Sequence, residues 1–166
     1  MPDARRLDPI TEATRLWEDH GWADAAPGMA AVTSLMRAHQ LVLSRVESVL
    51  KPLGVSFARY EVLMLLVFSR RGTLPMSTIG SRLQVHQTSV TNAVDRLEAA
   101  GLVRRLRHPS DRRTTLVEIT AAGRTLADEA TALLNRAVFA DPGLTKRDTT
   151  ALVGILGRLR KGAGDF

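Results

Sequence analysis

The sequence contains no cysteine and no long apolar run. Without cysteine, the chain has no disulfide bond, thiolate metal site, cysteine nucleophile or thiol-based redox sensor. The longest uncharged apolar run, Val62 to Phe68, is far shorter than the ~20 residues that cross a bilayer. The segment Met1 to Ile10 lacks the apolar stretch of a signal peptide. We therefore expect a cytoplasmic protein that makes no use of a membrane.

Sequence motifs for catalysis are also absent. The sequence has no G-x-S-x-G, no phosphate loop of the G-x-x-x-x-G-K type and no pair of carboxylates at a consistent spacing. The four histidines lie far apart and form no H-x-x-x-H pair, so we expect no zinc site within one chain. Only a site assembled across a dimer stays open. We expect neither an enzyme nor a bound cofactor or metal.

Acidic residues are fewer than basic ones. The 23 Lys and Arg against 17 Asp and Glu give a formal net charge of +6 and a pI near 10.9, which favours nucleic acid over a membrane as the partner. Between Met76 and Arg113, seven arginines oppose three acidic residues, so most of the excess lies there. The planar guanidinium binds phosphates and guanine edges in bidentate fashion. Charge alone also fits a solvated charged hairpin.

At 166 residues and 45% hydrophobic content, the chain suits one ordinary domain, or a small domain whose terminal elements lean on a partner. Residues 1–27 predict an extension, with a short helix from Thr11 to His20 and a turn through Pro27 and Gly28. Apolar residues then recur every three or four positions from Met29 to Leu50, which predicts a long amphipathic helix.

A second helix is expected to begin after Ser56, which is a favourable N-cap. Its section from Tyr60 to Phe68 is apolar on nearly every side, which predicts a central, buried position. Ser77 is expected to cap a short third helix that ends near Leu83. A brief turn then leads into a fourth helix, from about His86 to Ala100.

The fourth helix has two distinct faces. The face expected to be buried consists of Val90, Val94 and Leu97. The opposite face is small, polar and basic, and consists of Gln87, Thr88, Thr91, Asn92 and Arg96. Gly101 lies where a left-handed residue commonly ends a helix. Two helices joined by a short turn, the second with a polar outer face, predict a helix-turn-helix.

Two short segments, Val103 to Arg107 and Thr114 to Ile119, flank a turn-forming stretch and predict a β-hairpin with an arginine-lined tip. Thr120 is expected to cap a helix with an apolar inner face. The pair Thr145 and Asp148 predicts the start of the last helix.

The order of elements predicts a mainly α protein with a small β-hairpin wing, which is a winged helix-turn-helix domain over residues 55–120. Long helices flank this domain, in residues 28–54 and 121–166. Their apolar stripes are too long for so small a domain to cover alone. We therefore expect them to be dimerisation helices that join two copies of the chain in a homodimer.

From about Met29 to Arg160, the sequence resembles the MarR family of bacterial transcription regulators. The segment from Asp111 to Leu116 (DRRTTL), followed by Thr120 and Gly123, is similar to the family's wing signature. Leu83 to Gly101 is similar to its recognition helix and the glycine that ends it. The resemblance implies a homodimer that places recognition helices in the major groove and wings in the minor groove of double-stranded DNA. Many members are repressors released by small anionic or phenolic compounds.

Base reading is predicted for the recognition helix, because amide side chains pair with adenine and threonine contacts the thymine methyl. The residues are Gln87, Thr88, Thr91 and Asn92. Ser89 is expected to be partly buried or to contact phosphate, and Arg96 to bind phosphate. The alternative is that short polar residues in the first turn merely cap the helix.

In the wing, phosphate contacts are predicted for Arg104, Arg105 and Arg107. The resemblance implies that Arg112 enters the minor groove, where narrow A·T-rich sequence attracts arginine. It also implies that Asp111 and Arg113 hold the shape of the wing through a salt bridge and backbone hydrogen bonds, with Arg113 lying at the DNA as well. The alternative for each arginine is simple solvation.

An effector site is expected because Trp17 and Glu61 are similar in place to a tryptophan and an acid of the urate-responsive branch of the family. The alternatives are an apolar anchor for Trp17 and an acid favoured near a helix N-terminus for Glu61. The other candidates are His39, Arg45, Arg59 and Tyr60.

The sequence as a whole predicts a ligand-responsive, sequence-specific DNA-binding transcriptional regulator. We expect a homodimeric repressor that a small anionic or aromatic effector releases from a pseudo-palindromic operator. The alternatives are a non-switching architectural DNA-binding protein and an activator.

Overall fold

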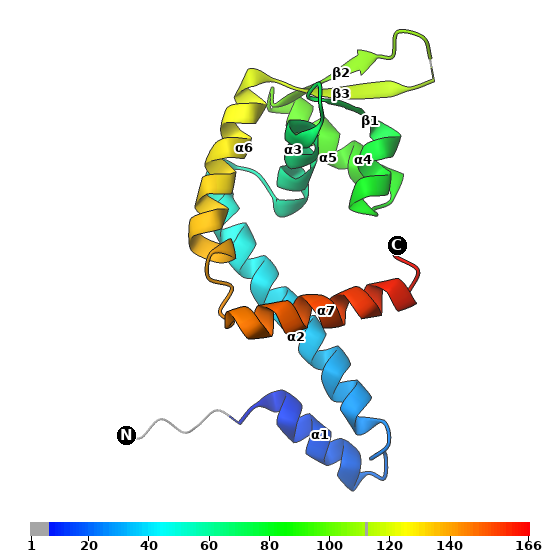
Figure 1. Cartoon of the computed structure of the whole chain (residues 1–166), viewed down its shortest axis with the longest axis vertical. Helices are drawn as coiled ribbons and strands as arrows, with labels where there is room; N and C mark the ends of the chain where they lie inside the picture. The colour runs from blue at the N-terminus through cyan, green and yellow to red at the C-terminus, as the bar shows by residue number, and fades with distance from the viewer. Residues whose placement is uncertain (1–6, 112) are drawn as a thin grey trace. The chain divides into compact units, whose positions relative to one another are not determined.

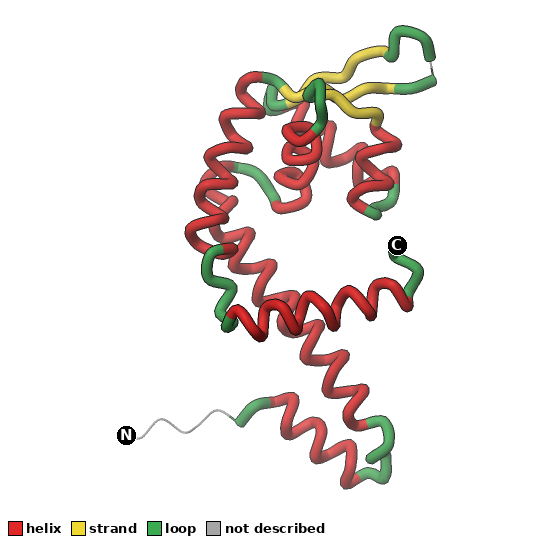
Figure 2. The backbone as a smooth tube through the Cα atoms, in the orientation of Figure 1, coloured by secondary structure: helices red, strands yellow, loops and turns green. Residues whose placement is uncertain are grey.

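The computed structural model describes residues 7–111 and 113–166. Arg112, predicted to enter the minor groove, therefore lies outside the described residues. The chain divides into two compact units, residues 1–45 and 46–166. The predicted fold class is confirmed, because most of the described chain is helical and its strands form one small antiparallel sheet (Figures 1 and 2). No helix in the described ranges is long and apolar enough to cross a membrane.

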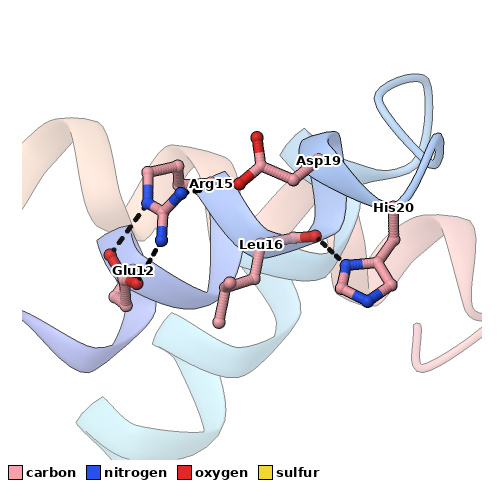
Figure 3. A network of polar contacts seen from close by, with 5 residues as sticks. All are labelled: Glu12, Arg15, Leu16, Asp19 and His20. Atoms are coloured by element: carbon pink, nitrogen blue, oxygen red, sulfur yellow. Dashed lines mark hydrogen bonds and ion pairs between the residues drawn. The ribbon is translucent and has the colours of Figure 1, made fainter.

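The first unit begins with α1 (Pro9–Asp19), which confirms the short N-terminal helix. The Asp8 carboxylate caps this helix by accepting hydrogen bonds from the first free backbone amides. The Arg15 guanidinium binds Glu12 one turn before it and Asp19 one turn after it, each at 2.6 Å (Figure 3). These pairs stabilise the helix only weakly, because the side chains are exposed and water screens the charges.

The long helix α2 (Ala26–Leu50) starts in the first unit and ends in the second. The turn expected at Pro27 and Gly28 is wrong, because both residues lie in the first turn of this helix. Proline is compatible with that position, since the first amides of a helix lack an intrahelical acceptor and the fixed φ of proline suits the helix. A short 3-10 turn (Lys51–Leu53) follows α2, and the left-handed Gly54, with φ of 68°, ends that turn.

The second unit is built around α3 (Phe57–Phe68), the expected central helix. Ser56 is its N-cap as predicted, and Glu47 of α2 adds a second cap by accepting from the Phe57 amide at 2.9 Å. The core of the unit forms around Leu63 and Leu66, which are fully buried, together with the sheet and the next two helices, α4 (Met76–Leu83) and α5 (Gln87–Ala99). Phe68, the last residue of the helix, is 75% exposed. The prediction that burial extends to Phe68 is therefore wrong.

The sheet has three strands in the order β1 (Thr73–Pro75), β3 (Thr115–Ile119) and β2 (Val103–Arg107), all antiparallel. The pair β2 and β3 confirms the predicted hairpin. Strand β1 was not predicted, because a three-residue strand that contains a proline shows no alternating pattern and exists only through its pairing with β3.

The chain passes from β1 directly into α4 (Met76–Leu83). The cap expected at Ser77 is therefore wrong: the N-cap is Pro75, and Ser77 lies inside the first turn. The second helix of the helix-turn-helix, α5 (Gln87–Ala99), follows after Gln84, which adopts a left-handed φ of 53°.

The predicted end of α5 is confirmed by two backbone hydrogen bonds. The Gly101 amide donates to the Glu98 carbonyl, and the Leu102 amide donates to the Leu97 carbonyl, each at 2.9 Å. With φ of 71° at Gly101, this is a Schellman motif.

Thr120 is the N-cap of α6 (Ala121–Leu134), as predicted, and it also ties this helix to the end of α5. Its hydroxyl accepts from the Gly123 amide and donates to the Gly101 carbonyl at 2.8 Å. A Cβ at Gly123 would lie 2.1 Å from the Leu102 carbonyl oxygen. Glycine is therefore required here for close packing.

After α6, a π-helical turn (Asn135–Phe139) leads to the last helix, α7 (Lys146–Gly162). The predicted capping pair is confirmed: Thr145 and Asp148 hydrogen-bond to each other at 2.6 Å, and the Asp148 amide donates to the Thr145 hydroxyl. No residue of α7 is buried in the single chain. Its apolar stripe is exposed and includes Leu152, Val153, Ile155 and Leu159.

Candidate nucleic-acid interface

The helix α5 presents the predicted polar residues on its exposed face. Its buried face contains Val90, Val94 and Leu97, as predicted, and packs against α3 and α4. The side chains that lie in solvent are Gln87, Thr88, Ser89, Thr91, Asn92 and Arg96. The N-cap of the helix is His86, whose Nδ1 accepts from the Thr88 amide at 3.2 Å. Contact of these side chains with DNA stays a prediction.

Some of the polar residues of α5 line one of two grooves, whereas Thr88 and Thr91 line neither. Gln87 lines a groove of about 350 Å³ with Ser77 of α4 and with Arg113 and Thr115 of the wing. A second groove, of about 540 Å³, lies between α3 and α5. It is lined by Ser56, Ala58, Arg59, Ser89, Asn92, Ala93 and Arg96. The sequence pattern predicted a single polar surface. Because successive helical residues are rotated by ~100° about the helix axis, these side chains point toward different neighbouring elements.

Arg105 is held by two acidic residues of α5, which argues against its predicted phosphate contact. Its guanidinium binds Asp95 at 2.6 Å and Glu98 at 2.5 Å, and its backbone amide donates to Glu98 at 2.8 Å. The backbone amide and then the guanidinium of Arg105 lower the pKa of Glu98. Both acids are on α5 and Arg105 is on β2, so this cluster joins the wing to the recognition helix. The spacing of the two acids, three residues apart, was the available signal.

The other arginines of the wing strands are exposed. Arg104 forms an ion pair with Glu118 across β2 and β3. Arg107, at the end of β2, is exposed. Both positions stay predicted phosphate contacts.

At the tip of the wing, the Asp111 carboxylate accepts from the Thr114 hydroxyl at 2.6 Å and from the Arg113 amide at 2.9 Å. These two hydrogen bonds, in that order, lower the pKa of Asp111. The backbone part of the expected role is confirmed. The side-chain salt bridge is wrong, because no ion pair in the described part of the wing joins Asp111 to Arg113, whose side chain lines the groove beside Gln87.

The structure brings one predicted effector residue of the second unit, Arg59, into a groove. Tyr60 is buried in the core, with its hydroxyl 3.0 Å from the Thr131 hydroxyl. Glu61 is half-buried, and burial raises its pKa. The remaining candidates, Trp17, His39 and Arg45, belong to the unit of residues 1–45. There, Trp17 packs edge-to-face against Trp22, with ring centroids 5.0 Å apart.

A helix-turn-helix followed by a basic hairpin defines a winged helix-turn-helix protein. The family model "MarR family" matches residues 56–115, from the cap of α3 to the first residue of β3. The crystal structure of Sco5413, a MarR family transcriptional regulator from Streptomyces coelicolor, is 48% identical and has a TM-score of 0.77. That match covers 84% of this chain and 97% of the other. The chain belongs to the MarR family of transcriptional regulators.

Two further relatives show the range of the family. The HTH-type transcriptional regulator PecS of Dickeya dadantii is 28% identical over 95% of this chain and 96% of its own length. CouR of Rhodococcus jostii RHA1, solved bound to p-coumaroyl-CoA, is 30% identical over 78% of this chain and 88% of its own, with a TM-score of 0.64. PecS is a transcriptional regulator, and the family is one of transcriptional regulators rather than enzymes.

Proposed function

We propose that this chain is a homodimeric repressor that binds a pseudo-palindromic operator and is released by a small anionic effector. The observation that carries the proposal is that α5 exposes Gln87 and Thr91 outside the groove between α3 and α5 and places Arg96 in its lining. Gln87 and Thr91 are exposed for base reading, while Arg96 lines the groove shared with Arg59 of α3. A ligand in that groove touches the same helix that reads the DNA.

Base reading by Thr91 is supported by the hydrogen bonding of its side chain. The Thr91 hydroxyl donates to the Gln87 carbonyl at 3.0 Å. The polar group is therefore used within the helix, and the methyl is the part that suits contact with a thymine methyl.

The groove between α3 and α5 suits a small anion. Its volume of about 540 Å³ is within the range of small-molecule sites, roughly 300–1,000 Å³. In the described ranges, no ion pair uses the guanidinium of Arg59 or Arg96. Two such cations favour a carboxylate. The ligand bound to CouR, p-coumaroyl-CoA, is itself an anion with an aromatic acyl group.

Release follows if Arg96 contacts a DNA phosphate in the complex and the effector carboxylate in its absence. An effector shifts the equilibrium only by its preference for the free over the DNA-bound protein. Competition for one guanidinium supplies such a preference.

The proposal is tested by screening aromatic and other organic acids in a thermal-shift assay, since a ligand of the native state raises the melting temperature. Each acid that raises it is then titrated into the protein–operator complex. We expect release from DNA, and loss of the thermal shift in Arg59→Ala. Arg71→Ala, an exposed arginine outside the groove, is the matched control and should keep the shift. An equal shift in Arg59→Ala, or no release by any acid, contradicts the effector site.

A further inference from the structure

The N-cap of the recognition helix is a histidine, although Ser, Thr, Asp and Asn are the usual residues there. The His86 Nδ1 lies 3.2 Å from the Thr88 amide nitrogen and 3.0 Å from the Thr88 hydroxyl. A backbone amide only donates, so Nδ1 must accept. The cap therefore requires a neutral imidazole with its proton on Nε2.

Protonation of His86 would remove this cap. Nδ1 would become a donor that faces the donating Thr88 amide, and a positive charge would be placed at the positive end of the helix dipole. The first turn of α5 contains Gln87 and Thr88, which are among the proposed base-reading residues. If this turn frays, binding of DNA must order it again. The loss of conformational entropy then weakens every operator contact made by these side chains.

We propose that His86 is a positioning residue for DNA recognition, whose neutral imidazole orders the first turn of α5 and whose protonation weakens operator discrimination. The proposal rests on the proposed reading of bases by α5. Histidine is the side chain that ordinarily changes charge around physiological pH. Discrimination is therefore expected where the imidazole is neutral and Nδ1 accepts, and is expected to fall when acidification protonates it.

The charged groups considered are those of α5 and of the elements packed against it, together with two groups beside neighbours of His86 in the sequence. They are Asp95, Arg96 and Glu98 of α5, Arg82 of α4, Arg59 and Glu61 of α3, Arg104, Arg105 and Arg107 of β2, Arg113 beside Gln87, and Asp165 beside Gln84. In the part of the chain that the structure describes, none of them forms an ion pair with His86. The nearest part of the tail, Asp165, accepts from Gln84 through its carbonyl and pairs its carboxylate with Arg160.

A protonated imidazole also attracts phosphates, which raises the affinity for any DNA. The quantity to measure is therefore the ratio of affinities for operator and scrambled duplex, in which this general attraction cancels. Between about pH 8 and about pH 5.5, we expect the ratio to fall roughly threefold to tenfold, the size of a typical N-cap loss.

Variants separate His86 from the other histidines. His86→Asn keeps an acceptor at the cap but does not titrate in this range, whereas His86→Ala removes the acceptor. His108 also accepts a backbone amide, that of Asp111, in the wing, so a pH effect in the wild type alone does not identify His86. His20→Asn is the matched control for a lost imidazole, because His20 lies at the end of α1, outside the helix-turn-helix.

The experiment uses a duplex selected by the full chain from a random pool at about pH 8, and a scrambled duplex of equal length. Fluorescence anisotropy then gives both affinities at about pH 8 and about pH 5.5. Wild type and His20→Asn should lose discrimination on acidification. His86→Ala should discriminate poorly at both pH values, and His86→Asn should restore discrimination relative to it without pH dependence.

A wild-type ratio that does not change with pH overturns the proposal, as does a His86→Asn ratio that falls as steeply as that of the wild type. Failure of the proposed function looks different: the wild type then shows no preferred duplex even at about pH 8.

Discussion

The arginines near the predicted DNA-binding face differ in whether an acidic side chain is paired with them. Arg105 is held by Asp95 and Glu98, whereas Arg107 is exposed at the end of β2. A phosphate-binding cation releases counterions, so its loss lowers the salt dependence of binding by about one unit of slope. A cation already paired with carboxylates contributes little to that slope.

We therefore expect Arg107→Ala to flatten the plot of log affinity against log salt concentration by roughly one unit. Arg105→Ala should leave the slope unchanged but weaken operator binding, because the wing loses its attachment to α5. Salt titrations of both variants on the same duplex give the measurement. A slope reduced equally by Arg105→Ala would show that Arg105 contacts phosphate after all.

Base reading is a second property of single residues. Replacing Gln87 or Thr91 by Ala should cost about 1–3 kcal/mol on the best operator and little on random DNA, because only a base contact distinguishes the two. Binding curves on both duplexes measure this difference. Equal losses on the two duplexes would mean that these side chains contribute to general affinity or to helix capping alone.

At the scale of elements, Gly123 sets the approach of α6 to the end of α5. A Cβ there meets the Leu102 carbonyl oxygen at 2.1 Å, and backbone cannot move aside as a flexible side chain can. We expect Gly123→Ala to lower the free energy of unfolding by about 1–3 kcal/mol, as overpacking does. Urea denaturation measures this change.

The matched control for Gly123 is Gly28→Ala in the first turn of α2, where no atom lies within 4 Å of the added methyl. This variant should be neutral or stabilised by up to about 1 kcal/mol, because alanine favours the helix. Equal effects of the two substitutions would show that the contact with Leu102 is not what selects glycine.

The elements that could be predicted from the sequence are those with local signals. The caps Ser56, Thr120 and Thr145 begin their helices as expected. Each hydroxyl accepts a hydrogen bond from the backbone amide three residues later, so the cap needs no distant partner. Strand β1 and the cap at Pro75 could not be predicted, since both depend on pairing with β3, about forty residues later.

The candidate site shows the same division. The polar face of α5 could be predicted from helical periodicity, and Val90 and Val94 are buried opposite it. The attachment of Arg105 to Asp95 depends on how the hairpin lies against the helix, and the two grooves depend on where α3 and the wing approach it. Such tertiary placement leaves no periodic pattern in the sequence.

At the scale of the whole molecule, the exposed apolar stripe of α7 needs a partner surface. Ile155 is 53% exposed and Leu159 is 56% exposed in the single chain. Apolar residues repeated along one helix face are costly in water, and a second copy covers them symmetrically. We expect a dimer at micromolar concentration in sedimentation equilibrium, and a shift toward monomer in Leu159→Glu.

A control for that shift is Lys161→Glu, which changes charge on the same helix outside the apolar stripe and should remain dimeric. Mainly folded monomer in the wild type would refute the dimer.

The most direct test of sequence-specific binding by a two-fold symmetric regulator is DNase I footprinting on the duplex selected from a random pool. Two recognition helices related by a dyad require half-sites about one helical turn apart, ~10 bp from centre to centre. The expected result is one short protected region that contains an inverted repeat with this spacing. Protection that spreads along the DNA without a boundary, or a protected site without dyad symmetry, would contradict the account and favour an architectural DNA-binding protein.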